Sequence, residues 1–100
     1  MMRVRLEVMP WLSELVNGDI SRKASLDQTL AEGSTLRDLL LKLHEGSGRL
    51  GPMIYDPKRG QLTGHAEISV NGSLYDAAGG LDSPLHDGDV VAILPGIAGG

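Results

Sequence analysis

Apolar and polar residues alternate near the start of the chain. Every second residue over positions 4–8 is apolar and the residues between them are charged, which predicts a strand with one buried face. Pro10 should end this strand, and residues 11–16 have enough helical spacing for about one turn. The triplet Asn17-Gly18-Asp19 then predicts a turn. Residues 23–30 alternate again, so we expect a second strand antiparallel to the first.

A helical period follows. Leucines recur at spacings i, i+3, i+4 and i+7 and predict an amphipathic helix over residues 36–44. Thr35 is placed as the N-cap, and Asp38 three residues later makes an arrangement like a capping box. Gly46 or Gly48 is expected to end the helix.

Strand patterns return in the second half. Residues 66–70 alternate and predict a third strand, Asn71-Gly72 predicts a two-residue hairpin turn, and residues 73–75 should pair back briefly. Residues 90–94 are apolar on both faces, as expected of a central strand that is covered on both sides. Before these strands we expect an exposed loop over residues 55–61, flanked by short strands.

The predicted order is strand, strand, helix, strand, short strand and strand. This is the order of a β-grasp fold in the α+β class, in which a mixed sheet of four to five strands packs on one main helix. No repeat or domain boundary is visible in the 100 residues. We therefore predict one domain over residues 1–95 and a flexible tail over residues 96–100 that ends in diglycine.

Composition narrows the classes of function. The absence of cysteine excludes disulfides, thiolate nucleophiles and cysteine-based zinc sites. The formal charge of −4 and the lack of a basic stripe argue against a nucleic-acid partner. We find no signal-peptide pattern and no apolar run long enough to span a membrane. We therefore expect a cytoplasmic location and no membrane partner.

Several familiar kinds of site find no support in the sequence. Asp87-Gly88-Asp89 offers two carboxylates, fewer than a calcium loop needs, so we interpret it as a tight turn. The three histidines lack metal-ligand spacing, and we expect no metal site. Neither a nucleophile-elbow serine nor a glycine-rich phosphate loop occurs. Any ATP used with this chain would have to be bound by a partner.

The end of the chain offers a chemical group of its own. Pro95 fixes φ and lacks an N–H, so it should end the last strand. The following Gly96-Ile97-Ala98-Gly99-Gly100 is almost without side chains, and five extended residues span at most about 17 Å. Such a tail can pass a narrow channel into another protein. There the carboxylate of Gly100 could attack a nucleotide phosphate and form an acyl-adenylate, which a sulfur or nitrogen nucleophile would displace.

Three motifs together resemble the ubiquitin-like sulfur carriers. They are Leu85-x-Asp87-Gly88-Asp89-x-Val91-Ala92-x-x-Pro95 ahead of the terminal diglycine, Val70-Asn71-Gly72, and Gly33-x-Thr35-Leu36-Arg37-Asp38-Leu39-Leu40. The resemblance is greatest to the small subunit of molybdopterin synthase. The thiamine-pathway sulfur carrier and the archaeal ubiquitin-like modifiers share the same ending.

The resemblance implies a carrier without catalytic activity and without a bound cofactor. An E1-like enzyme, using ATP and Mg, would adenylate the carboxylate of Gly100 and convert it to a thiocarboxylate. Gly96, Ile97, Ala98 and Gly99 would lie in the partner's channel, and the sulfur would pass to an acceptor such as the molybdopterin synthase large subunit. Thiamine, tRNA thiolation and other sulfur pathways stay open as destinations. So do a modifier that forms isopeptide bonds with lysine and a plain binding module with an incidental tail.

Apolar residues near the base of the tail predict a partner interface, because exposed apolar patches often mark partner surfaces. The residues concerned are Met9, Trp11, Val91, Ile93, Leu94 and Pro95. The alternative, that several of them belong to the core, remains open at this point.

Overall fold

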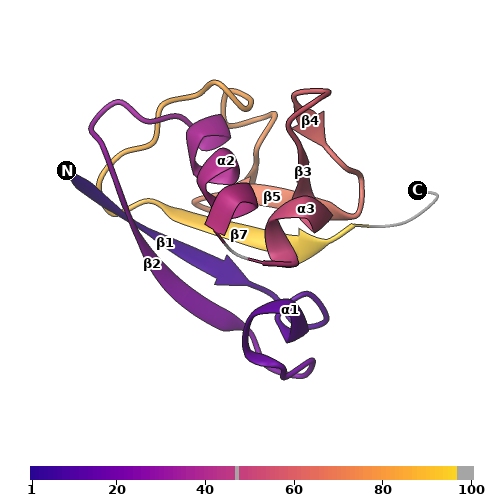
Figure 1. Cartoon of the computed structure of the whole chain (residues 1–100). Helices are drawn as coiled ribbons and strands as arrows, with labels where there is room; N and C mark the ends of the chain where they lie inside the picture. Colours follow the sequence, from indigo (N-terminus) through magenta and orange to yellow (C-terminus); the bar gives the residue numbers. More distant parts are fainter. Residues whose placement is uncertain (47, 97–100) are drawn as a thin grey trace.

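A mixed five-stranded sheet forms the body of the molecule (Figure 1). The computed structural model describes residues 1–46 and 48–96. The strand order is β2-β1-β7-β5-β6, with bounds β1 Met2–Val8, β2 Ala24–Leu30, β5 Ala66–Val70, β6 Ser73–Leu74 and β7 Val90–Pro95. β1 pairs with β2 antiparallel and with β7 parallel. The predicted α+β arrangement, with a mixed sheet on one main helix, is confirmed.

The helices cover one face of this sheet (Figure 1). The main helix is α2 (Leu36–Gly46), followed by the short α3 (Leu50–Ile54) and a two-stranded sheet of β3 (Tyr55–Asp56) and β4 (Gln61–Leu62). A single turn, α1 (Glu14–Asn17), lies in the connection between β1 and β2. No helix in the described ranges is long and apolar enough to cross a membrane.

The core follows the two predicted periods. β1 buries Val4, Leu6 and Val8 completely and points its charged residues outward. The leucine face of α2 packs onto these residues within one cluster of buried side chains. The predicted capping box is confirmed, because the Thr35 N–H donates to Asp38 Oδ2 at 2.9 Å and the Asp38 N–H donates to Thr35 Oγ1 at 3.2 Å.

Two features of the middle segment differ from the prediction. α2 continues two residues beyond the expected end at 44, and α3 was not predicted. Glycine and proline have low helix propensity. Because α3 contains Gly51 and Pro52, its sequence does not predict a helix. In the fold, a Cβ on Gly51 would overlap the backbone of His44. This close packing of α3 on the end of α2 is a tertiary contact that local sequence does not reveal.

The expected loop over residues 55–61 has the predicted flanking strands, but it begins inside the core. Tyr55 is 3% exposed, and its hydroxyl accepts a hydrogen bond from Arg37 Nη1 at 2.9 Å. Arg37 also donates to the carbonyl of Gly60 and to Asp82 Oδ1. A single side chain of α2 therefore connects two loops that lie far apart in the sequence.

The acidic turn before β7 is structural, as predicted. Asp87 Oδ1 accepts the Arg3 N–H at 2.8 Å, and Asp89 Oδ2 accepts the His86 N–H at 2.8 Å. Asp89 Oδ1 also accepts Asn71 Nδ2 at 3.0 Å. The carboxylates thus stabilise the turn, and the described part of the chain contains no group of three or more potential metal ligands.

Candidate functional site at the root of the C-terminal tail

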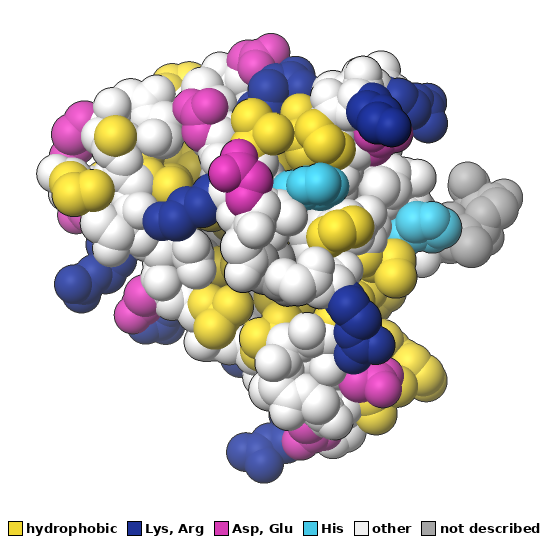
Figure 2. Space-filling view, viewed as in Figure 1, with side chains coloured by type: hydrophobic (Ala, Val, Ile, Leu, Met, Phe, Trp, Pro, Cys, Tyr) yellow, Lys and Arg dark blue, Asp and Glu magenta, His cyan; other side chains and the backbone are white. Residues whose placement is uncertain are grey.

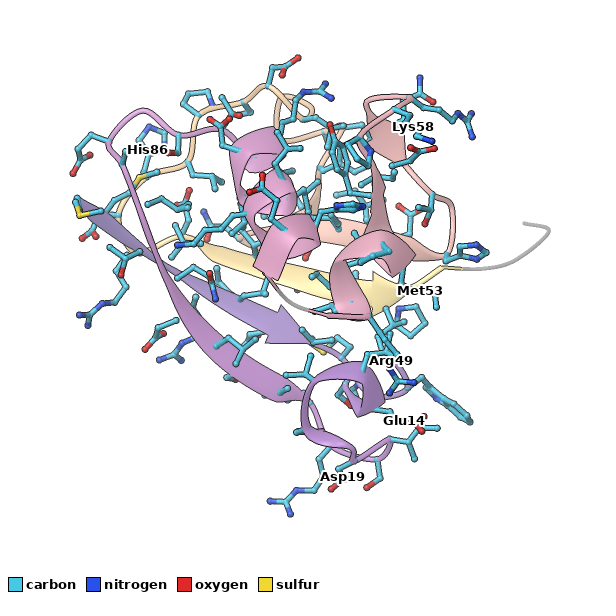
Figure 3. The ribbon with its side chains drawn as sticks, in the orientation of Figure 1. Glu14, Asp19, Arg49, Met53, Lys58 and His86 are labelled. Atoms are coloured by element: carbon cyan, nitrogen blue, oxygen red, sulfur yellow. The ribbon has the colours of Figure 1, made fainter. Side chains whose placement is uncertain are left out.

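The tail follows β7, the central strand of the sheet. Pro95 and Gly96, at the end of this strand, are called the root of the tail. β7 is bonded to β1 on one side and to β5 on the other, and its last residue, Pro95, lies opposite Ala66. The Met9 N–H donates to the carbonyl of Ile93 at 2.9 Å. Because β1 and β7 are parallel, the loop that follows β1 lies beside the point where the tail begins. In Figure 3, Met53 of α3 and Glu14 of α1 lie toward this end, and His86 lies toward the opposite end.

Gly96 is the last described residue and is seated against β5. Its N–H donates to the carbonyl of His65 at 2.9 Å. A Cβ built on Gly96 would lie 2.6 Å from the carbonyl oxygen of Gly64 and 2.9 Å from the carbonyl carbon of His65. Both neighbours are backbone atoms, which cannot rotate away as a side chain can. Only glycine fits this position with the hydrogen bond intact.

Of the predicted tail residues, the structure describes only Gly96. Gly96 was expected in the free tail over residues 96–100, but its backbone is bonded to the start of β5. Sequence analysis missed this contact because nothing in the sequence shows that Gly64 and Gly96 approach each other. The other predicted tail residues, Ile97, Ala98, Gly99 and the reactive Gly100, lie outside the described residues.

The predicted apolar patch is partly wrong. Val91 and Ile93 are both 0% exposed, because their side chains belong to the buried cluster. They are therefore core residues and cannot contact a partner. Leu94 points to the opposite face and is half-buried, and Pro95 is exposed. On that open face Glu67 lies opposite Leu94, so the apolar surface at the root has an acidic neighbour.

Met9 and Trp11 begin the loop beside the root. Met9 is half-buried, and Trp11 is 70% exposed. The φ of Trp11 is +82°, in the left-handed region, which costs about 1–2 kcal/mol for a residue other than glycine. A hydrogen bond from the Trp11 N–H to the carbonyl of Ile20 at 2.9 Å holds this conformation. Ile20 is itself 42% exposed, so this loop presents two large apolar side chains.

Hydrogen bonds within the loop stabilise its conformation. The buried Ser13 hydroxyl donates to the carbonyl of Asp19 at 2.8 Å, and the Asp19 N–H donates to Asn17 Oδ1 at 2.8 Å. Ser21 donates to the Asp19 carboxylate through its hydroxyl and its N–H, and these bonds lower the pKa of Asp19. The exposed Trp11 is thus carried by an ordered loop.

Comparison with known proteins places this arrangement in a family. Residues 14–100 match the ThiS family. The chain belongs to the ThiS family. Sulfur carrier protein CysO from Mycobacterium tuberculosis is 35% identical over 71 residues, which are 70% of this chain and 76% of that protein. The predicted membership in the ubiquitin-like sulfur carriers is therefore confirmed.

Solved structures share the fold. Small archaeal modifier protein 1 from Methanosarcina acetivorans is 25% identical with a TM-score of 0.71, covering 100% of this chain and 98% of its own. A putative molybdopterin converting factor subunit 1 from Pyrococcus furiosus is 22% identical with a TM-score of 0.67, covering 97% of this chain and 100% of its own. This ThiS-family chain therefore has the ubiquitin-like β-grasp fold that the sequence predicted.

Proposed function

We propose that this chain carries sulfur on the carboxylate of Gly100. The observation that supports the proposal most directly is the root of the tail. The central strand β7 is followed directly by Gly96, whose N–H is bonded to the carbonyl of His65 just before β5, and four residues of the sequence follow Gly96. Those four residues can span at most about 14 Å. The folded body can therefore rest outside a partner while the carboxylate reaches a nucleotide inside it.

The chemistry is shared between this chain and its partners. An E1-like enzyme that binds ATP and Mg would let the carboxylate of Gly100 attack the α-phosphate, releasing pyrophosphate and forming an acyl-adenylate. Hydrosulfide supplied by the partner would then attack the carbonyl carbon and displace AMP, which leaves a thiocarboxylate on Gly100. This chain contributes the carboxylate and the narrow tail that carries it, whereas the partner contributes the nucleotide site and the sulfur.

The tail itself offers a partner few side chains to recognise. Ile97 is the one large side chain beyond the root, and Ala98, Gly99 and Gly100 are the small residues that follow it. Small residues let the tail pass a narrow channel, but they provide little apolar surface and no charged side chain for binding. Recognition therefore has to come mainly from the folded body.

We infer that the body is recognised at the loop beside the root. Trp11 and Ile20 are exposed there, and exposed aromatic residues are frequent anchors at protein interfaces. A protein that takes the tail into its active site also comes close to the loop that follows β1, because this loop lies beside the end of β7. The exposed Trp11, the half-buried Met9 and Leu94, and the exposed Pro95 therefore remain our candidates for the partner interface.

The protein that accepts the sulfur is a separate question. The molybdopterin synthase large subunit stays a candidate, supported by the fold shared with the Pyrococcus furiosus protein. The relative with the higher identity is a sulfur carrier, CysO, which favours another destination. We therefore propose the carrier step for this chain and leave the acceptor to be decided by transfer assays.

Intact-mass spectrometry tests the carrier step. The chain is incubated with a candidate E1-like enzyme, ATP, Mg and a sulfur donor, and it should gain the mass that corresponds to replacing one oxygen by sulfur. A variant that lacks Gly99 and Gly100 should keep its circular-dichroism spectrum and gain no mass. Sulfur transfer by the truncated variant would refute the proposal. Conjugates with lysine side chains of other proteins would instead identify a protein modifier.

A further inference from the structure

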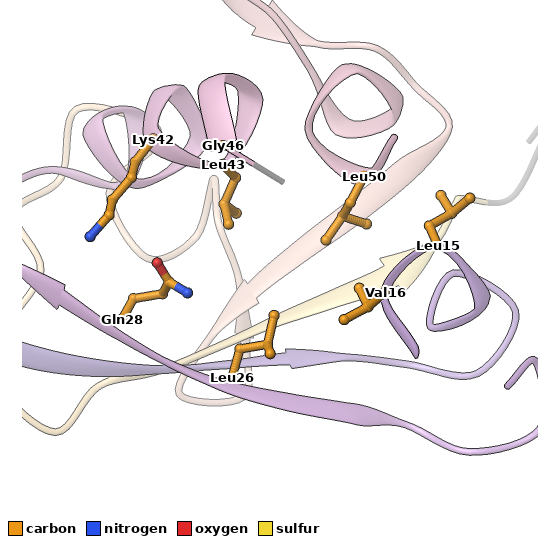
Figure 4. A pocket seen from close by; sticks show the side chains of 8 residues that line it. All are labelled: Leu15, Val16, Leu26, Gln28, Lys42, Leu43, Gly46 and Leu50. Carbon is orange, nitrogen blue, oxygen red and sulfur yellow. The ribbon is translucent and has the colours of Figure 1, made fainter. Parts of the chain in front are cut away.

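A groove opens on the helical side of the sheet and extends along β2 to α1, in the loop that follows β1. Its volume is about 430 Å³, and it lies between β2, α1 and the ends of α2 and α3 (Figure 4). Leu43 and Leu50 are buried side chains that line it, and Leu15, Val16 and Leu26 are half-buried. Figure 2 shows hydrophobic side chains gathered on the same face, between α2 and β2. The groove therefore presents apolar side chains and is accessible to a ligand.

One end of the groove is polar. Gln28 and Lys42 lie at that end, and Leu15 and Val16 lie at the other (Figure 4). Lys42 is exposed, and its Nζ donates to the carbonyl of Thr29 at 2.7 Å. A ligand with an apolar portion and a carboxylate at one end would match this distribution of side chains.

The strand that borders the groove has an open edge. β2 is the outermost strand of the sheet and, among the described residues, pairs only with β1. The Arg5 N–H donates to the carbonyl of Asp89, so the backbone of Arg5 faces β7 and not its β2 neighbour Asp27. The backbone of Asp27 consequently faces outward. The bond from Lys42 to the Thr29 carbonyl shows that Thr29 faces outward too, as the alternation of an antiparallel strand requires.

We propose that the open edge of β2 and this groove together bind an extended segment of a partner protein. The segment adds to β2 as a further strand, which is a recurring mode of peptide recognition. Its alternate side chains, which are apolar, enter the groove beside Leu26. A carboxylate in the segment pairs with Lys42, whose Nζ is released when an N–H of the segment binds the carbonyl of Thr29.

A peptide fits these observations better than a second copy of the chain does. Antiparallel pairing of two β2 strands centred on Asp27 would place the two Asp27 carboxylates opposite each other, and like charges in that position are destabilising. β2 is separated from β7 by β1, so a segment that pairs with the outer edge of β2 forms no backbone hydrogen bonds with the strand that carries the tail. The proposal therefore goes beyond the carrier function and adds a second binding surface.

Two synthetic peptides test the proposal by NMR titration of the full chain. Each peptide contains four residues, alternately valine and isoleucine, and two aspartates. The aspartates stand at the amino end of one peptide and at the carboxyl end of the other, because the bound segment could run parallel or antiparallel to β2. At about 1 mM peptide, one of the two should shift the amide signals of Asp27, Thr29 and Lys42. The absence of shifts with both peptides, or shifts confined to other strands, would overturn the proposal.

Matched variants separate strand addition from simple hydrophobic contact. Asp27→Pro removes the outward N–H, whereas Asp27→Asn removes the same charge and keeps that N–H. Binding should be lost in Asp27→Pro and kept in Asp27→Asn. Lys42→Glu should weaken binding about tenfold and favour a peptide with lysines in place of the aspartates. Equal binding by the two Asp27 variants would overturn the proposal, and peptide-dependent dimerisation in sedimentation experiments would indicate a second copy as the occupant.

A readout of the carrier step keeps the two proposals distinct. The Asp27 variants should gain sulfur at the rate of the unaltered chain, because β2 does not contact the root. If the chain gains no sulfur but binds the peptide, the carrier proposal fails and the groove proposal stands. If it gains sulfur and binds neither peptide, the reverse holds.

Discussion

Substitution of Gly96 by alanine tests the role of the root. The new Cβ would lie 2.6 Å from the Gly64 carbonyl oxygen and 3.1 Å from the Ala66 nitrogen. The chain can relieve these overlaps by moving β5 or by releasing its own end from β5. Releasing the end breaks the hydrogen bond from the Gly96 N–H to the His65 carbonyl.

The release is the less costly response. A backbone hydrogen bond contributes about 0.5–1.5 kcal/mol to stability, whereas distortion of a packed region costs about 1–3 kcal/mol. Alanine also restricts the unfolded chain, which offsets about 0.4–1 kcal/mol. We therefore expect the global free energy of unfolding to fall by at most about 1 kcal/mol. Re-ordering one released residue at the partner costs about 1–2 kcal/mol, which is roughly five- to thirtyfold in kcat/KM for adenylation.

Hydrogen exchange and steady-state kinetics measure the two effects. In Gly96→Ala, the amide at position 96 should lose its protection from hydrogen exchange, and kcat/KM for adenylation should fall. Gly46→Ala is the matched control, because a Cβ at Gly46 meets no atom within 4 Å, and it should keep the kinetics of the unaltered chain. If Gly96→Ala retains both the protected amide and the full kcat/KM, the steric reasoning is refuted.

Three further predictions concern other positions. Ile93→Ala should lower the free energy of unfolding by about 2–5 kcal/mol because it leaves a cavity, whereas Leu94→Ala should lower it by about 1 kcal/mol; equal losses in urea unfolding would contradict the assigned faces. Trp11→Gly should relieve the left-handed backbone and raise stability by up to about 1 kcal/mol, while raising the KM for adenylation; an unchanged KM would remove this residue from the interface. Arg37 lowers the pKa of Asp82 from 3.8, so the stabilisation is present at neutral pH and lost as the pH falls below 3.8. Asp82→Asn should accordingly be less stable than the unaltered chain at pH 7, and the difference in urea midpoints should shrink as the pH falls below 3.8.

Most elements of the fold could be predicted because they are determined locally. Alternation identified β1, and leucine spacing identified α2, since each pattern follows from the geometry of one element. Asn71-Gly72 has positive φ at both residues, as its hairpin requires. By contrast, α3 contains residues that disfavour a helix, and its formation depends on packing against α2.

The candidate site was predictable only in part. The diglycine end and the proline before it are visible in the sequence, and they indicated which end of the chain to consider. The sequence did not show that Val91 and Ile93 are buried while Leu94 faces outward, because an apolar strand has no polar residue to mark its exposed face. It also did not show the exposed conformation of Trp11, which depends on a hydrogen bond to Ile20.

The sequence by itself determined the order of the main strands and the main helix, the family resemblance and the small-residue end, because these depend on residue identity and short-range spacing. Only the tertiary structure decided where the tail is held, because that depends on the approach of Gly96 to residues about thirty positions earlier. The same holds for the open edge of β2 and the groove beside it, which arise when strands, helices and loops distant in sequence pack together.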